Sequence, residues 1–237
     1  MTVTGRLGAV VFDAADITTL ASFYADLTGW PIAQNDADWV ALQAADGLEV
    51  SFQLAPDHQP PQWPGQDRPQ QYHLDLYAEG REAAADRAVE LGATRLADGD
   101  GWITLADPAG HPFDLCEKDG VTAPLELFAA TIDAPDAGAL ARFYDEVLGT
   151  EVTYDGPEGS LVGGGGNNLL FQQVGDYNPP AWPDPQRPQQ GHLDIVVDDL
   201  DAGEGRVTEL GATRLEGGGD RFRVYADPAG HPFCLCL

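Results

Sequence analysis

The chain has 237 residues, of which 43% are hydrophobic, enough to fill the core of one large domain or two small ones. Its 39 acidic and 12 basic residues give a net charge of −27, which argues against binding to nucleic acid or to anionic membranes. No apolar run approaches the roughly 20 residues of a membrane span, and the N-terminal stretch is too short and too weakly charged for a secretory signal. We therefore expect a cytoplasmic protein.

The first elements in chain order are predicted to be a strand, a helix and two further strands, at 7–12, 17–27, 39–43 and 48–54. Asp16 can cap the helix, and Gly29 is placed to end it. Strand 48–54 alternates cleanly, so that Glu49, Ser51 and Gln53 share one face.

The next predicted elements follow a proline-rich loop. The predicted elements are a strand at 72–77, a helix at 81–91 and strands at 94–96, 102–106 and 112–117. The last two strands are joined by the turn Asp107-Pro-Ala-Gly110. We predict that His111, directly after this turn, has a structural or solvent role.

The whole pattern is then repeated about 120 residues later. Phe23-Tyr24 recurs at Phe143-Tyr144, and the stretch 107–113 recurs at 227–233. A near-constant offset over the full length indicates a tandem duplication. We predict a first domain at 1–118, a linker at 119–124 and a second domain at 125–237. The three cysteines are expected to be reduced, and Cys234 and Cys236, two apart on a strand, are poorly placed for a disulfide.

One motif is written twice, as Arg-Pro-Gln-Gln-Tyr-His-Leu-Asp at 68–75 and Arg-Pro-Gln-Gln-Gly-His-Leu-Asp at 187–194. Residues two apart on a strand share a face, so each histidine and its aspartate point the same way. The histidine is either a metal ligand or acid/base, or it is held by its aspartate as part of the scaffold. The loop residues either form an aromatic and cationic lid at a cavity mouth or pack between the copies; these residues are Trp63, Arg68, Gln70, Gln71 and their counterparts Trp182, Arg187, Gln189, Gln190.

The layout, the Phe-Tyr helix, the Asp-Pro-Ala-Gly-His-Pro-Phe turn and the His-Leu-Asp strand together resemble the vicinal-oxygen-chelate superfamily. This group includes glyoxalase I, extradiol dioxygenases and the bleomycin-resistance proteins, and the chain is most similar to its small glyoxalase-like domains. The resemblance covers each copy once. It implies an α+β fold in which each domain has two βαβββ modules that form a cupped mixed sheet with helices outside.

The resemblance also implies a divalent metal inside the cup, held by residues of the first and last strands of each half. The matching positions are Ala9, Glu49, His73 and Asp114 in the first copy and Ala129, Asn168, His192 and Cys234 in the second. We therefore predict a metal at Glu49, His73 and Asp114, either iron, manganese, zinc or nickel, with the alternative that no metal is bound.

Two functions follow from this resemblance. The first is lyase, isomerase or dioxygenase chemistry on a small molecule in the cup of the first copy, with unknown catalytic residues. The second is metal-free binding of an antibiotic or another small molecule, as in the resistance proteins. The predicted substrate-binding residues are Gln53, Trp63, Arg68, Asp75, Trp182, Arg187 and His192. We expect a monomer that acts as a pseudo-dimer, or a homodimer.

Overall fold

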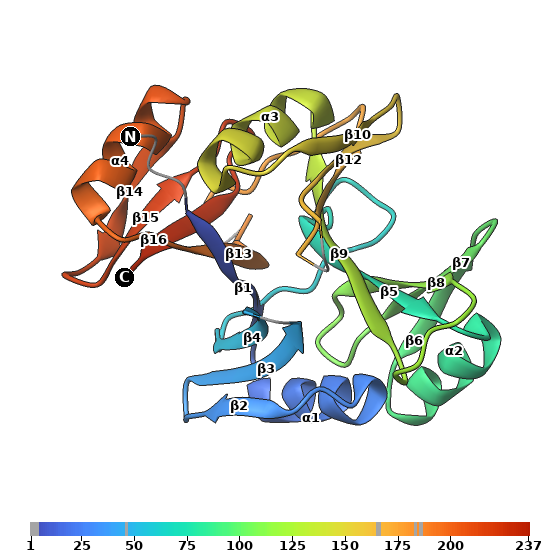
Figure 1. Cartoon of the computed structure of the whole chain (residues 1–237). Coiled ribbons are helices and arrows are strands. Elements are labelled where there is room, and N and C mark those ends of the chain that lie inside the picture. Colours follow the sequence, from blue (N-terminus) through green and yellow to red (C-terminus); the bar gives the residue numbers. More distant parts are fainter. Residues whose placement is uncertain (1–4, 46, 165–166, 183, 185–186) are drawn as a thin grey trace.

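The computed structural model describes residues 5–45, 47–164, 167–182, 184 and 187–237 (Figure 1). Within them the chain forms four helices and sixteen strands, arranged as four βαβββ modules. Among the described residues, no helix has the length and apolarity needed to span a membrane.

The first copy supplies the first two modules. Module 1 consists of β1 (Arg6–Ala14), α1 (Ile17–Thr28), β2 (Ile32–Asn35), β3 (Trp39–Ala45) and β4 (Leu48–Leu54). Module 2 consists of β5 (Tyr72–Ala78), α2 (Arg81–Glu90), β6 (Thr94–Asp98), β7 (Trp102–Ala106) and β8 (Pro112–Glu117).

The second copy repeats this order. Module 3 consists of β9 (Glu126–Ala134), α3 (Ala137–Leu148), β10 (Val152–Asp155), β11 (Gly159–Val162) and β12 (Leu169–Gln173). Module 4 consists of β13 (Gly191–Val196), α4 (Leu200–Glu209), β14 (Thr213–Gly218), β15 (Phe222–Ala226) and β16 (Pro232–Cys236). The predicted α+β fold class is confirmed.

Local signals act at the ends of helix α1 as the sequence predicts. The side chain of Asp16 accepts a hydrogen bond from the Thr19 backbone N–H at 3.0 Å. Gly29 ends the helix with φ +78°, a conformation that costs glycine little because it has no Cβ. Strand β2 was not placed by the sequence analysis because all of its residues are exposed, so it has no buried alternation to detect.

The modules pair across the two copies. Sheet A has the strand order β14-β15-β16-β13-β1-β4-β3-β2, and sheet B has the order β10-β11-β12-β9-β5-β8-β7-β6. Sheet A therefore joins modules 1 and 4, and sheet B joins modules 2 and 3, while the helices lie outside the sheets (Figure 1). The expectation that the two halves of one copy form one cup is wrong. Because the four modules share one hydrophobic pattern, periodicity cannot choose between these pairings.

The joint between the two sheets contains a reciprocal pair of glutamines, which we call the glutamine clasp (Gln71 and Gln190). The Gln71 backbone N–H donates to Gln190 Oε1 at 3.0 Å, and the Gln190 backbone N–H donates to Gln71 Oε1 at 2.9 Å. Their amide nitrogens donate to Pro188 O at 2.9 Å and Pro69 O at 2.7 Å. Of the two alternatives for the repeated loop, packing between the copies thus holds for this pair.

The Asp-Pro-Ala-Gly-His turns also join the sheets. Tyr24 in α1 donates from its hydroxyl to Asp107 Oδ2 at 3.1 Å, and the His111 backbone N–H donates to Asp107 Oδ1 at 3.0 Å. The His111 ring is fully buried and meets the edge of Phe12 with a centroid distance of 5.2 Å. His111, in module 2, thus packs against module 1, which agrees with a structural role.

His58 makes this joint sensitive to acid. Its Nε2 lies 3.2 Å from Ala109 O, and its ring centroid is 4.8 Å from that of His111. Burial, and then the neighbouring His111, lower the pKa of His58 from 6.5 to about 4. A base whose pKa is lowered by folding binds more protons when unfolded, so the stabilisation is complete above pH 6.5 and is lost as the pH falls toward 4.

We expect His58→Gln to flatten this part of the pH dependence. Between pH 7.5 and 5 the wild type should lose about 1 kcal/mol more unfolding free energy than the variant, after allowance for solvent screening of a partly exposed ring. Urea unfolding at both pH values measures the difference. Equal losses in the two proteins would contradict the assignment.

Candidate functional site

Each sheet has one face that carries a histidine and an aspartate of the repeated motif. We call the face of sheet B with His73 and Asp75 cup B, and the face of sheet A with His192 and Asp194 cup A. In both cups a residue of the neighbouring parallel strand joins the pair, because Asp75 is in register with Asp114 and Asp194 with Cys234.

Cup B brings together His73, Asp75 and Asp114. The ligand atoms of the three side chains all lie within 4.8 Å of one another. His73 Nε2 is 3.9 Å from Asp75 Oδ1 and 4.0 Å from Asp114 Oδ2. These separations exceed a hydrogen bond and approach the ~3.4 Å between two ligand atoms that share a tetrahedral ion about 2.1 Å away.

Two threonines fix which oxygen of each carboxylate faces the histidine. Thr131 Oγ1, on β9 of the second copy, donates to Asp75 Oδ2. Thr104 Oγ1, on β7, donates to Asp114 Oδ1 at 2.6 Å. The other oxygens, Asp75 Oδ1 and Asp114 Oδ2, are those that approach His73. Partners that orient ligating carboxylates in this way are typical of metal sites, so the residues of cup B fit a divalent ion.

Burial sets the electrostatics of the cluster. The side chains of His73 and Asp75 are almost fully buried, and burial raises the pKa of Asp75 despite the opposing effects of His73 and Thr131. A buried carboxylate is costly when charged, and a cation would offset that cost.

Glu49, the third predicted metal ligand, does not belong to this cluster. It lies on β4 in sheet A, where it is in register with Ala9, and Ala9 in turn with Asp194. The prediction that Glu49, His73 and Asp114 share one cup is therefore wrong for Glu49, because its module pairs with module 4. The third member of the cup B cluster is Asp75, which had been predicted to bind substrate.

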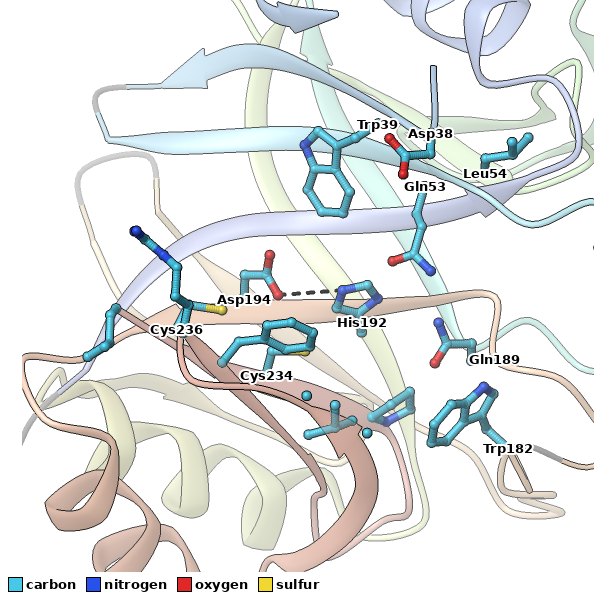
Figure 2. A pocket seen from close by; sticks show the side chains of 17 residues that line it. Asp38, Trp39, Gln53, Leu54, Trp182, Gln189, His192, Asp194, Cys234 and Cys236 are labelled. Atoms are coloured by element: carbon cyan, nitrogen blue, oxygen red, sulfur yellow. Dashed lines mark ion pairs between the residues drawn. The ribbon is translucent and has the colours of Figure 1, made fainter. Parts of the chain in front are cut away.

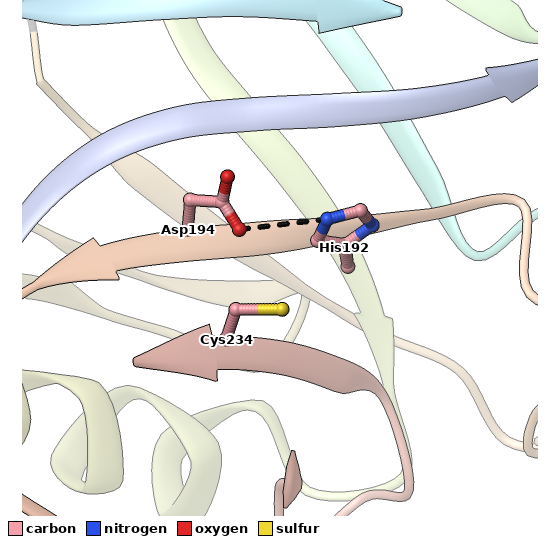
Figure 3. Close-up of side chains that lie close together, drawn as sticks. All are labelled: His192, Asp194 and Cys234. Atoms are coloured by element: carbon pink, nitrogen blue, oxygen red, sulfur yellow. Dashed lines mark ion pairs between the residues drawn. The ribbon is translucent and has the colours of Figure 1, made fainter. Parts of the chain in front are cut away.

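Cup A holds a second cluster of His192, Asp194 and Cys234, whose ligand atoms also lie within 4.8 Å of one another (Figure 3). His192 Nε2 is 3.5 Å from Asp194 Oδ1. The repeated motif predicted that His192 and Asp194 share a face, and the resemblance put His192 and Cys234 at ligand positions, but only the structure brings all three together. The repeated His-x-Asp spacing was the available signal.

A cavity of about 750 Å³ opens beside this cluster (Figure 2). Three of the predicted substrate-binding residues, Gln53, Trp182 and His192, line it together. They come from β4, from the proline-rich loop and from β13, so the cavity exists only because module 1 pairs with module 4. Gln189, which was one of the candidate lid residues at a cavity mouth, lines it as well, and so does Trp39, which was not predicted.

Each of the two loop arginines donates hydrogen bonds within its own loop. Arg68 donates from Nε to Pro60 O, and Arg187 donates from Nη1 to Asn178 Oδ1 at 3.0 Å. Neither contact reaches the metal-ligand clusters. Trp63 is half-buried in the first loop, and its role in substrate binding stays a prediction.

Comparison with known proteins identifies the same two units. The family model described as a glyoxalase-like domain matches residues 9–116 and again 129–236. None of the curated proteins matches the chain.

Solved structures with the same fold include glyoxalase I from Zea mays, with a TM-score of 0.67 and 15% identity over 98% of this chain and 92% of that one. A candidate dioxygenase from Bacillus subtilis has a TM-score of 0.64 and 13% identity over 100% of this chain and 86% of that one. At such identities the likeness shows the fold.

Proposed function

Because the chain belongs to the glyoxalase-like domain family of the vicinal-oxygen-chelate superfamily, once in each copy, we propose that it acts on a small molecule with a divalent metal held in cup B. The observation that supports this is the convergence of His73 Nε2, Asp75 Oδ1 and Asp114 Oδ2, with the second oxygen of each carboxylate held by a threonine.

The two carboxylates are hard donors and the imidazole is a borderline one, a combination that suits Mn²⁺, Fe²⁺ or Zn²⁺. A metal bound there would supply Lewis-acid polarisation of a substrate oxygen, or two open positions for neighbouring oxygens. The protein residues would hold the ion, orient the substrate and keep water away. Lyase or isomerase chemistry on a carbonyl compound and oxygenation both agree with this donor set.

The test is binding of Mn²⁺, measured by the loss of the free-ion signal in electron paramagnetic resonance. We expect one Mn²⁺ per wild-type chain in cup B and none in His73→Ala. Thr131→Val, which removes only the hydroxyl that orients Asp75, should weaken binding about 10–100-fold.

The matched control is His192→Ala, which removes the equivalent histidine of the other cup and should leave this Mn²⁺ site intact. Binding that is absent in the wild type, or unchanged in His73→Ala, would contradict the proposal. Absence of Mn²⁺ binding in the wild type would instead favour the metal-free alternative.

A specific observation supports that alternative, in which the chain binds a small molecule without a metal. The cavity of cup A is about 750 Å³, within the range of pockets for drug-sized ligands, and is lined by Trp39, Trp182 and Phe222. The amides of Gln53 and Gln189 add hydrogen-bonding groups to these aromatic walls. A ligand with a planar ring and polar substituents would match them.

A further inference from the structure

A second cavity adjoins the one of about 750 Å³ in cup A. Its volume is about 480 Å³, and three residues, Trp39, Asp194 and Cys236, line both cavities. The two are therefore neighbouring compartments of one cup. We call the smaller one the end compartment, and the residues that line it but not the larger compartment include Gly8, Glu49 and Val196.

The duplication shows why this space exists in cup A, because cup B is filled at the same positions. The counterparts of Gly8 and Val196 are Phe128 and Tyr77. The rings of Phe128 and Tyr77 contact each other with a centroid distance of 4.7 Å. Gly8 leaves the equivalent place empty, and a Cβ there would come within 2.8 Å of Val196 Cγ2. A glycine and a valine thus open a compartment that two aromatic side chains close in the other cup.

The end compartment carries a carboxylate that has no partner. Glu49 is half-buried on its wall and forms no hydrogen bond or ion pair with any described residue. Its counterpart in cup B is the neutral Asn168, whose amide donates to a backbone carbonyl at 2.7 Å. Asp194 adds a second carboxylate to the wall. Among the described lining residues the one basic side chain is Arg6, which is exposed and donates to Gly47 O at 2.5 Å.

An aromatic side chain stands at the boundary between the two compartments. Trp39 lines both of them, and Figure 2 shows its indole directed toward Asp194. Its counterpart in cup B is Gly159, since Trp39 is in register with Gln53 and Gly159 with Gln172. Cup A therefore places a tryptophan next to unpaired negative charge, and both features attract an organic cation.

His192 gives a separate sign that the larger compartment is built to hold a ligand. Its side chain lines that compartment, and its Nδ1 is buried without a hydrogen-bond partner among the described residues. Buried polar groups without partners are rare in folded proteins and mark places where a ligand or water belongs.

From this arrangement we propose that cup A binds an elongated organic cation. Its ring lies against the aromatic walls of the larger compartment, and its ammonium group lies in the end compartment beside Glu49 and Asp194. Gly8 and Val196 then set the length of the ligand, and Glu49 selects its charge. This inference rests on the metal-free binding function proposed for cup A and names its ligand class; it is independent of the metal proposed for cup B.

The test compares three compounds of equal length that differ in charge: 4-phenylbutylamine, 4-phenylbutanol and 4-phenylbutyrate. Isothermal titration calorimetry at about 0.3 M salt screens the general attraction of cations to a chain of net charge −27. We expect the amine to bind at least about 10-fold more tightly than the alcohol, because a charge-assisted hydrogen bond to a carboxylate is gained. The butyrate should bind more weakly than the alcohol.

Two variants assign the amine to the end compartment. Glu49→Gln keeps the size of the side chain and removes its charge, so it should weaken the amine about 10-fold and leave the alcohol unchanged. Val196→Tyr places the tyrosine of cup B in the end compartment and should weaken the amine to a similar extent. The matched control is Asp38→Asn, because Asp38 is exposed and lines only the larger compartment; its effect should stay within about 2-fold.

The outcomes separate this inference from the function on which it rests. Equal affinities of the amine and the alcohol would overturn the inference, although cup A would still bind small molecules without a metal. An amine affinity that is unchanged in Glu49→Gln would also overturn it. Absence of binding by all three compounds would count against the metal-free function as well. If circular dichroism shows that Val196→Tyr does not fold, Glu49→Gln decides alone.

Discussion

Residues 1–120 expressed alone should not fold as a monomer. In the whole chain β1 pairs with β13 on one side and β5 pairs with β9, so each central strand of the first copy has its antiparallel partner in the second. Removing the second copy turns both strands into edges and exposes buried residues such as Val10 and Leu74 to water. Size-exclusion chromatography with light scattering should show an assembly or an unfolded chain.

Complementation gives the control for this truncation. Residues 121–237 carry the missing modules 3 and 4, so mixing the two fragments should restore a one-to-one complex with the circular dichroism of the intact chain. A fragment 1–120 that unfolds cooperatively as a monomer, at a midpoint independent of its concentration, would contradict the cross-copy pairing.

Gln190→Leu should have the second large effect, on the glutamine clasp. The variant removes the acceptor of the Gln71 backbone N–H and the donor to Pro69 O, and the contacts it breaks are buried. A buried polar group left without a partner costs about 1–3 kcal/mol, so two of them should lower the free energy of unfolding by about 3 kcal/mol. Urea unfolding of the intact chain measures this change.

Gln62→Ala is the matched control, since Gln62 lies in the same loop as the first motif but its side chain is exposed. We expect its effect to stay within about 0.5 kcal/mol. A loss below about 1 kcal/mol for Gln190→Leu would show that the clasp does not stabilise the joint between the sheets.

The Arg-Pro-Gln-Gln-x-His-Leu-Asp motif shows how far the sequence could be interpreted. Alternation alone predicted that His73 and Asp75 share a face, and the structure confirms this by placing both against Asp114. The same stretch left two roles open for its glutamines. Only the positions of Gln71 and Gln190 across the joint show that they link the copies, because a hydrogen bond between residues 119 apart has no local signature.

Glu49 illustrates the opposite case. Its face on β4 was predicted from the alternation of Glu49, Ser51 and Gln53, and β4 is the strand expected. Its partners were predicted wrongly, because the sequence analysis assumed that modules 1 and 2 form one sheet. The register of β1 with β13 places Glu49 in the row of Ala9 and Asp194 instead.

By itself the sequence determined the duplication, the order of the elements apart from strand β2, the caps of helix α1 and the face on which each histidine lies. These features depend on residues close together in the chain and on periodicities of two and 3.6 residues. The tertiary structure alone decided which modules share a sheet, and therefore which side chains meet in each cup. Four modules with the same pattern can bury their apolar faces in more than one pairing. The choice rests on specific contacts between distant residues, such as those of the glutamine clasp.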